Sequence, residues 1–198
     1  MPRIRVVCFC VFVCGLLSAP ISAQVRMVSV NPETAEVVLR NFGGTPVDVT
    51  AWWMCESVGT YRPINELSPS GPTVLPPGGE VTVTFTDYIT PTGQGVGLYD
   101  EAFFSLQEGG DQHIRDYMQY LTPDGFREPV AVAAGIWPED DTVEGPGPYR
   151  YTGDGTQNGA AFWTTSGGNT PVPSLSLPGG LLLVGAFIGT ARGVRRKR

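Results

Sequence analysis

The chain has 198 residues, of which 41% are hydrophobic and 16% are charged, and its formal net charge is −6. Between the two ends, over residues 24–170, six arginines and no lysine oppose 19 acidic residues, so this middle part carries −13. So strong a negative charge repels phosphate backbones, which argues against nucleic-acid binding. The length of the middle part suits one domain with a single core.

The N-terminal segment 1–23 has the layout of a secretory signal peptide. Arg3 and Arg5 form a short basic region, and the run 6–17 that follows is apolar almost throughout. This run is shorter than the roughly 20 residues that a membrane-spanning helix needs. Small residues come next, so we expect cleavage between Ala23 and Gln24. The alternative is a signal helix that stays uncleaved as an anchor or packs into the core.

The segment 24–163 is predicted to be one all-β domain with a sandwich architecture. It is rich in Val, Thr, Gly and Pro, and short apolar alternations are broken by turns with almost no helical periodicity. In its first half we expect strands at 24–30, 36–40, 47–55 and 80–85. Turns are expected at 41–46 and 75–79, and a polar loop at 56–73. Trp52 and Trp53 are adjacent, so only one of them can point into the core of a regular strand.

The second half gives weaker signals. We expect a hairpin from 97–99 and 102–104, a turn at 109–111 and a strand at 114–120. Residues 127–137 form either a short helix or a buried segment, and Val130, Val132 and Gly135 favour an extended or irregular form. Short strands at 149–151 and 161–163 are expected to close a sheet edge, before a flexible linker over 164–170.

Three motifs in the first half resemble the lamin-tail domain family. They are EVVLRN at 36–41, GGTPVDVTAW at 43–52 and LPPGGEVTV at 75–83. The resemblance covers about residues 30–120, with 116–120 similar to a later strand of that family. The chain departs from the family where Ala51 replaces the usual glycine and where a long insertion fills 56–73. This resemblance implies an immunoglobulin-like β-sandwich.

The C-terminal segment 174–198 is predicted to be a single transmembrane helix with a basic cytoplasmic tail. Residues 177–191 carry no charge, and as a helix they are about 22 Å long at 1.5 Å per residue. Including Leu175 and Val194 brings the span near the roughly 30 Å of a hydrocarbon core. The basic residues that follow belong on the cytoplasmic side, so the domain lies on the other side of the membrane. Four of them end the chain: Arg195, Arg196, Lys197 and Arg198.

The order of short motif, apolar helix and terminal basic residues resembles the tripartite sorting signals of exported bacterial proteins, the PEP-CTERM group. The motif of that group is Val-Pro-Glu-Pro, and the linker 164–173 ends with its first two residues, Val172 and Pro173. Ser174 and Leu175 depart from it, although 173–176 is similar to variants that begin Pro-x-Leu-Ser. The resemblance implies processing by an exosortase-type membrane protease. A simple single-pass tail anchor is the alternative.

Residues suited to catalysis are sparse. His113 is the only histidine, and it stands beside a turn with no serine or cysteine in a nucleophile context, so we expect a surface histidine. Cys55 is the only cysteine outside the signal segment, and we expect a small buried hydrophobe there. One histidine and one cysteine exclude the usual zinc ligand sets. We therefore assign no catalytic or cofactor-binding residue.

The acidic run Glu139, Asp140 and Asp141 is the one candidate for metal binding. Carboxylate oxygens on a loop are the ligands that Ca²⁺ prefers. The spacing matches no defined calcium loop, so solvated loop charge is the interpretation that we favour.

These patterns predict a non-enzymatic exported protein at the cell envelope or cell surface. Its β-sandwich would serve as a binding or structural module, tethered or sorted through the C-terminal tail. The expected partners are the membrane, an exosortase-type protease and a surface or matrix polymer, and no cofactor is expected. An envelope hydrolase that uses acidic residues and a calcium-binding adhesion module are the alternatives.

Overall fold

The structure, a computed structural model, describes residues 25–57, 60–86, 89–102 and 110–165. Over these residues the chain is mostly β-strand, and every pair of named strands is antiparallel. The prediction of an all-β fold is therefore confirmed. The expected signal helix, the tail with its sorting motif and most of the linker lie outside the described residues.

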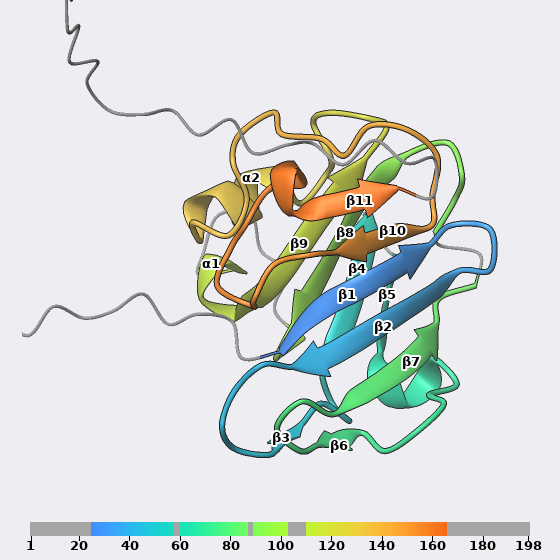
Figure 1. The fold of residues 1–198 in the computed structure, drawn as a ribbon, viewed down its shortest axis with the longest axis vertical. Coiled ribbons are helices and arrows are strands. Elements are labelled where there is room, and N and C mark those ends of the chain that lie inside the picture. Colours follow the sequence, from blue (N-terminus) through green and yellow to red (C-terminus); the bar gives the residue numbers. More distant parts are fainter. Residues whose placement is uncertain (1–24, 58–59, 87–88, 103–109, 166–198) are drawn as a thin grey trace, which may run out of the picture.

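The larger sheet has five strands in the order β11-β10-β1-β2-β7. Strands β1 and β2 form a long hairpin at its centre, with β7 on one side and the two C-terminal strands on the other (Figure 1). The strands are β1 (Val25–Asn31), β2 (Glu36–Asn41), β7 (Glu80–Thr84), β10 (Tyr149–Tyr151) and β11 (Trp163–Thr165).

The second sheet has four strands in the order β5-β4-β8-β9. A small ribbon, β3 with β6, lies at the end of the molecule near β7 (Figure 1). The strands are β3 (Val47–Asp48), β4 (Trp53–Ser57), β5 (Thr60–Pro63), β6 (Val74–Leu75), β8 (Gln94–Tyr99) and β9 (Ile114–Tyr120). Four short helical turns complete the described part: η1 (Ile64–Glu66), α1 (Gly110–His113), α2 (Glu128–Ala133) and η2 (Ala160–Phe162).

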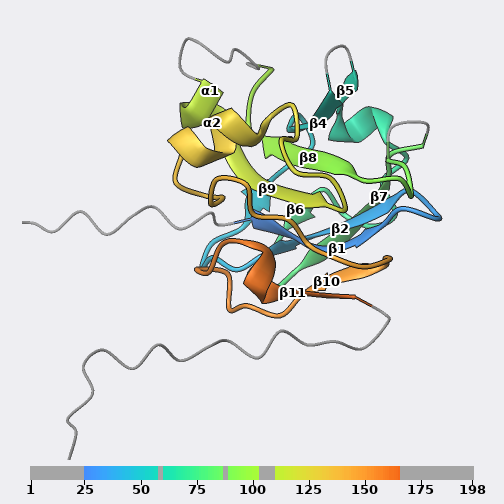
Figure 2. The same ribbon diagram turned by 90° about the horizontal axis from the view of Figure 1, so that it is seen from above.

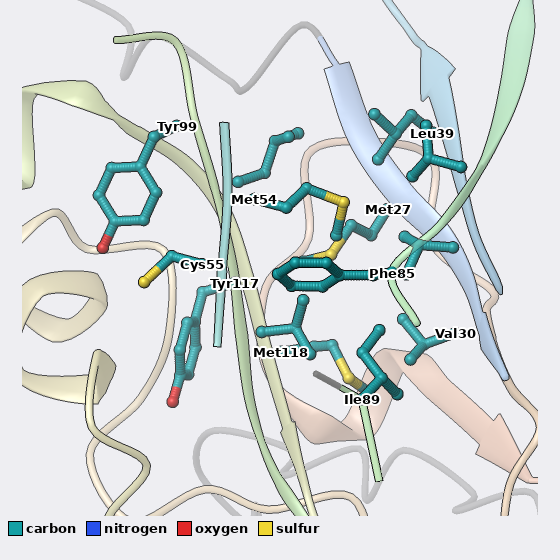
Figure 3. Packing of buried hydrophobic residues seen from close by; sticks show 14 of the residues in the cluster. Met27, Val30, Leu39, Met54, Cys55, Phe85, Ile89, Tyr99, Tyr117 and Met118 are labelled. Carbon is teal, nitrogen blue, oxygen red and sulfur yellow. The ribbon is translucent and has the colours of Figure 1, made fainter. Parts of the chain in front are cut away.

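The two sheets lie face to face, and the helices α1 and α2 lie on the outer side of the four-stranded sheet (Figure 2). The core between the sheets is built from alternate residues of the strands. Phe85 lies at its centre among Met27, Met54 and Met118 (Figure 3), and all four side chains are fully buried. Flexible methionine side chains fill the irregular space around a rigid ring.

The four-stranded sheet is buried on its outer face as well. Tyr99 and Tyr117 lie on the side away from Phe85 (Figure 3), under the layer that contains α2. Two glycines of β8 make room for these rings. A Cβ atom on Gly95 would meet the Tyr117 hydroxyl oxygen, and one on Gly97 would lie 2.9 Å from Cε2 of Tyr99. Strand β9 therefore joins two packed layers, which explains why nearly all of its residues are buried.

Several predicted elements are confirmed. Strands β1, β2, β7 and β9 lie where alternation placed them, and β10 pairs with β11 at a sheet edge. Strand β11 begins at Trp163, two residues later than expected, because 160–162 form the helical turn η2. The turn between β6 and β7 also forms as expected: the Gly79 N–H donates to the Pro76 carbonyl at 2.7 Å. Gly78 has a φ of 74°, a backbone conformation that glycine adopts without strain.

Three predictions are wrong in whole or in part. The expected strand 47–55 is interrupted, because the Asp48 side chain accepts the Thr50 N–H at 2.9 Å and forms a turn. The turn separates β3 of the small ribbon from β4 of the four-stranded sheet. The expected loop 56–73 contains β5 and η1. Strand β8 pairs with β4 and β9, and most of its expected hairpin partner, 102–104, lies outside the described residues.

The third concerns residues 127–137, where the pattern favours an extended or irregular form over the alternative of a short helix. They contain the helix α2 instead, with Pro129 in its first turn. Proline is well suited to that position because its fixed φ is helical and its missing N–H has no partner there. The Val130 and Ala131 side chains face inward and are buried. Within the described residues, no helix combines the length and the apolar character that a membrane span requires.

Candidate functional site

The predicted acidic run 139–141 divides into three different environments. Asp140 is exposed and joins Asp124 and Glu128 in a group whose carboxylate oxygens lie within 4.8 Å of one another. Glu139 is exposed and lies outside this group. Asp141 faces another way, and its Oδ2 atom accepts the Ala160 N–H at 2.6 Å. The structure thus brings together only one of the three candidates, with two residues that the spacing did not suggest.

Glu128 is the buried member of this group, with 4% of its surface exposed. Its Oε1 atom accepts two hydrogen bonds, from the Gln119 amide nitrogen at 2.9 Å and from the Asp140 N–H at 2.7 Å. Burial raises the pKa of the Glu128 carboxyl above its usual range, because a charged carboxylate loses its hydration there. The two donors oppose this effect without cancelling it.

The Glu128 carboxylate belongs to a polar network centred on Gln119 of β9, which is fully buried. The Gln119 carbonyl oxygen accepts hydrogen bonds from the Tyr117 hydroxyl at 2.9 Å and from the Gly125 N–H at 3.0 Å. Its nitrogen donates to Glu128 and to the Asp141 carbonyl, both at 2.9 Å, and lies 3.4 Å from the Thr142 hydroxyl. This network attaches the segment after α2 to the outer face of the sheet.

We expect calcium to leave this group of carboxylates unoccupied. The inner oxygen of Glu128 is already bonded to two donors, and Ca²⁺ requires six to eight oxygen ligands. Addition of millimolar Ca²⁺, or of a chelator, should therefore not change the melting temperature of the purified protein. A rise with Ca²⁺ that the chelator reverses would establish a calcium site instead, because a ligand that binds the native state raises its stability.

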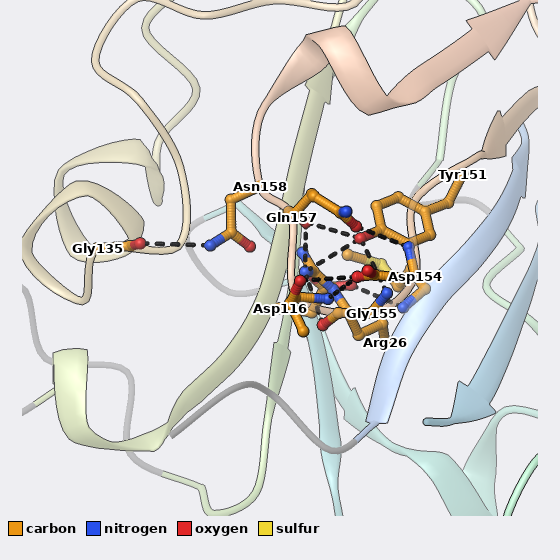
Figure 4. Close-up of polar contacts among 10 residues, drawn as sticks. Arg26, Asp116, Gly135, Tyr151, Asp154, Gly155, Gln157 and Asn158 are labelled. Carbon is orange, nitrogen blue, oxygen red and sulfur yellow. Dashed lines mark hydrogen bonds and ion pairs between the residues drawn. The ribbon is translucent and has the colours of Figure 1, made fainter. Parts of the chain in front are cut away.

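A second buried polar centre links the two sheets. Arg26 of β1 and Asp116 of β9 form an ion pair of 2.8 Å, with 2% and 0% of their surfaces exposed. The other Asp116 oxygen accepts the Met27 N–H at 2.7 Å. Arg26 also donates to the carbonyls of Gly155 and Gln157, at 3.3 and 2.6 Å, so the loop after β10 is held on the same arginine (Figure 4).

The remaining reactive side chains have structural surroundings. Cys55 is fully buried, as predicted, and Arg127 Nε lies 3.3 Å from its sulfur. Burial raises the pKa of the Cys55 thiol, which disfavours the reactive thiolate. His113 is partly exposed, and its Nδ1 atom lies 3.2 Å from Asp100. Asp100 also accepts a hydrogen bond from Arg115 Nε at 2.6 Å.

Neither buried polar centre was predicted from the sequence. Apart from Arg115, the other residues of the strand that holds Asp116 and Gln119 are aromatic or apolar, and polar residues inside such a strand are the only signal that marks them. Their partners come from remote parts of the chain: Arg26 lies 90 residues before Asp116. No protein-family model, curated protein or solved structure matches this chain.

Proposed function

We propose that this chain is a non-enzymatic, exported structural or binding module, displayed at the cell envelope and tethered or sorted through its C-terminal tail. The observation that carries the proposal is the extent of the folded domain. The described domain begins with β1 at Val25, directly after the expected cleavage site, and its last strand ends at Thr165, before the tail. The segments in which the sequence predicts export and membrane signals, 1–23 and 174–198, precede and follow this domain in the chain.

The immunoglobulin-like, lamin-tail-like character of the domain is part of the same proposal. The motifs on which that resemblance rests are neighbours in space, since β2 pairs with β7 and β3 pairs with β6. Asn41 of the first motif is fully buried. Its side-chain nitrogen donates to the carbonyls of Thr45 and Leu75, at 2.8 and 2.9 Å, and its oxygen accepts the Gly43 N–H at 2.8 Å. Asn41 thus connects the three motifs by hydrogen bonds.

A structural role agrees with how the buried charges are used. Arg26 pairs with Asp116, and Glu128 bonds to Gln119, so these groups hold parts of the domain together. The domain's net charge of −13 keeps it soluble outside the cell and directs it toward cationic or neutral surfaces and matrix polymers.

Fractionation of the producing cells, followed by mass spectrometry of the protein's termini, tests the proposal. The mature protein should begin at Gln24. If the tail is a sorting signal, its C-terminus should lie near Ser174, and the protein should leave the inner membrane. If the tail is only an anchor, Arg198 is retained in the membrane fraction and the exosortase-type partner is ruled out. A protein that keeps Met1 and stays in the cytoplasm would overturn the whole proposal.

The competing hydrolase hypothesis has its own test. Amide replacements at the clustered carboxylates, Asp124→Asn and Asp140→Asn, should leave any activity of the purified protein toward envelope polymers unchanged. Loss of a measured turnover in these variants, with the fold retained, would favour the hydrolase.

A further inference from the structure

The carbonyl group of Gln119 is polarised in the way that acyl-transfer sites polarise a carbonyl. Two donors, the Tyr117 hydroxyl and the Gly125 N–H, point at its oxygen from 2.9 and 3.0 Å. Burial raises the pKa of Tyr117 far above its usual value, so the hydroxyl keeps its proton and stays a donor. Fixed donors of this kind stabilise the negative charge that develops on a carbonyl oxygen when a nucleophile attacks its carbon.

The nitrogen of the same amide has more acceptors than hydrogens. It carries two N–H bonds, and Glu128 and the Asp141 carbonyl take these at 2.9 Å each. The Thr142 hydroxyl oxygen, at 3.4 Å, is a third neighbour. Thr142 thus lies beside the amide although both N–H bonds of the amide already have other acceptors. Its hydroxyl is a potential nucleophile.

Glu128 is suited to move the proton in such a reaction. Its Oε1 atom touches the amide nitrogen, which would leave, and that nitrogen also lies next to the Thr142 hydroxyl. The raised pKa of its carboxyl brings it closer to the working pH of a general acid and base. The carboxylate therefore contacts the nitrogen that would accept the proton, and that nitrogen in turn lies beside the hydroxyl that would give it up.

We propose that Gln119 and Thr142 react with each other to form an intramolecular ester bond, with Glu128 as the proton carrier. The Thr142 side chain rotates to bring Oγ1 over the face of the Gln119 amide, and Oγ1 bonds to Cδ as Glu128 takes the hydroxyl proton. The Cδ–Nε2 bond then breaks, and Glu128 returns that proton to the nitrogen. The amide and the hydroxyl become one ester and one ammonia, and no oxidant or cofactor is required.

The bond would connect β9 covalently to the segment that follows α2. Gln119 is fully buried, so the ester carbonyl is shielded from water, while the ammonia diffuses away. A crosslink of this kind closes a loop in the chain and restricts the unfolded state, as a disulfide does. The inference is independent of the export proposal, because it concerns only the folded domain.

Trypsin digestion of the purified full chain gives a direct test. The protein has arginines at 115, 127 and 150 and no lysine between them, so the peptide 116–127 contains Gln119 and the peptide 128–150 contains Thr142. We expect these two peptides to be recovered joined, with a combined mass lower by one ammonia molecule. Alkaline hydroxylamine should separate them, because it cleaves oxygen esters and leaves ordinary amides intact. Recovery of both peptides unlinked at their sequence masses would overturn the proposal.

Peptide mapping is necessary because the intact mass is ambiguous. A mature N-terminal Gln24 loses ammonia when it cyclises, and this gives the same change in mass. The mass loss therefore has to be located in the joined 116–127 and 128–150 peptides. A loss found only in the N-terminal peptide counts against the ester.

Three variants separate the roles of the reacting groups. Thr142→Val removes the hydroxyl at nearly constant shape and should abolish the link, whereas Thr142→Ser keeps a nucleophile and should retain it. Glu128→Gln keeps an oxygen that can accept from Gln119 and from the Asp140 N–H, but it cannot carry the proton, so the linked fraction should fall at least tenfold. Circular dichroism confirms that each variant is folded. Retention of the link in Thr142→Val would assign it to another residue and overturn the proposal.

Discussion

Replacing Asp116 by leucine is expected to lower the free energy of unfolding by about 3–5 kcal/mol, because removal of one partner leaves the other charge buried and unpaired. The guanidinium of Arg26 is 2% exposed, and Asp116 is its only carboxylate partner among the described residues. Its Nε atom already has no hydrogen-bond partner within the described part of the chain. The variant also leaves the Met27 N–H without the Asp116 oxygen that it now bonds. Urea denaturation of both proteins measures the difference.

A double replacement separates the cost of an orphaned charge from the value of the pair. Arg26→Met together with Asp116→Leu removes both charges. Replacement of a buried ion pair by apolar residues often leaves the stability of a protein unchanged. We expect the double variant to recover more than half of the loss in Asp116→Leu. The Met27 N–H and the carbonyls of Gly155 and Gln157 still lose a partner, so recovery is incomplete.

The exposed ion pair between Arg40 and Glu80 is the matched control. Its atoms are 3.8 Å apart and its side chains are 45% and 47% exposed, so Glu80→Gln should change stability by less than about 1 kcal/mol. Equal effects of Glu80→Gln and Asp116→Leu would show that burial does not set the strength of the Arg26–Asp116 contact.

Two of the strands that sequence reasoning located correctly, β2 and β7, have one buried face and one partly exposed face. Strands β2 and β7 alternate in burial along their length, so the period of two is visible in the residues themselves. The polar residues on the other face and the turns rich in glycine and proline then define the ends. Such elements carry their own local signal, and no knowledge of their neighbours is needed.

The elements that were missed depend on tertiary contacts. Residues 128–133 contain two valines and suggest a strand, yet packing of Val130 and Ala131 against the outer face of the sheet selects a helix. That outer layer also explains why Asp116 and Gln119 are both buried, although they lie on opposite faces of β9. Asp116 pairs with Arg26, and Gln119 pairs with Glu128. No periodic pattern in the sequence indicates that these residues meet.

The core around Phe85 gives the second large expected effect. Phe85→Ala removes a fully buried ring from the middle of the space between the sheets, and such replacements lower the free energy of unfolding by about 3–5 kcal/mol. Met27, Met54 and Met118 surround the ring (Figure 3). Their flexible side chains can move into part of the cavity, so we expect a value near the lower end, about 3 kcal/mol. Guanidinium denaturation monitored by tryptophan fluorescence measures it.

Phe126 provides the matched control, since it is the same residue type with 37% of its surface exposed. Its contact with the Arg127 guanidinium, 4.7 Å from the ring centre, contributes about 0.5–1 kcal/mol at an exposed site. Phe126→Ala should therefore lower stability by less than about 1 kcal/mol, a third or less of the effect of Phe85→Ala. Phe85→Leu keeps most of the apolar volume, so its loss of stability should lie between those of Phe85→Ala and Phe126→Ala. A loss below about 1 kcal/mol for Phe85→Ala would mean that the two sheets do not enclose a close-packed core at this residue, because a ring in such a core cannot be removed at so small a cost.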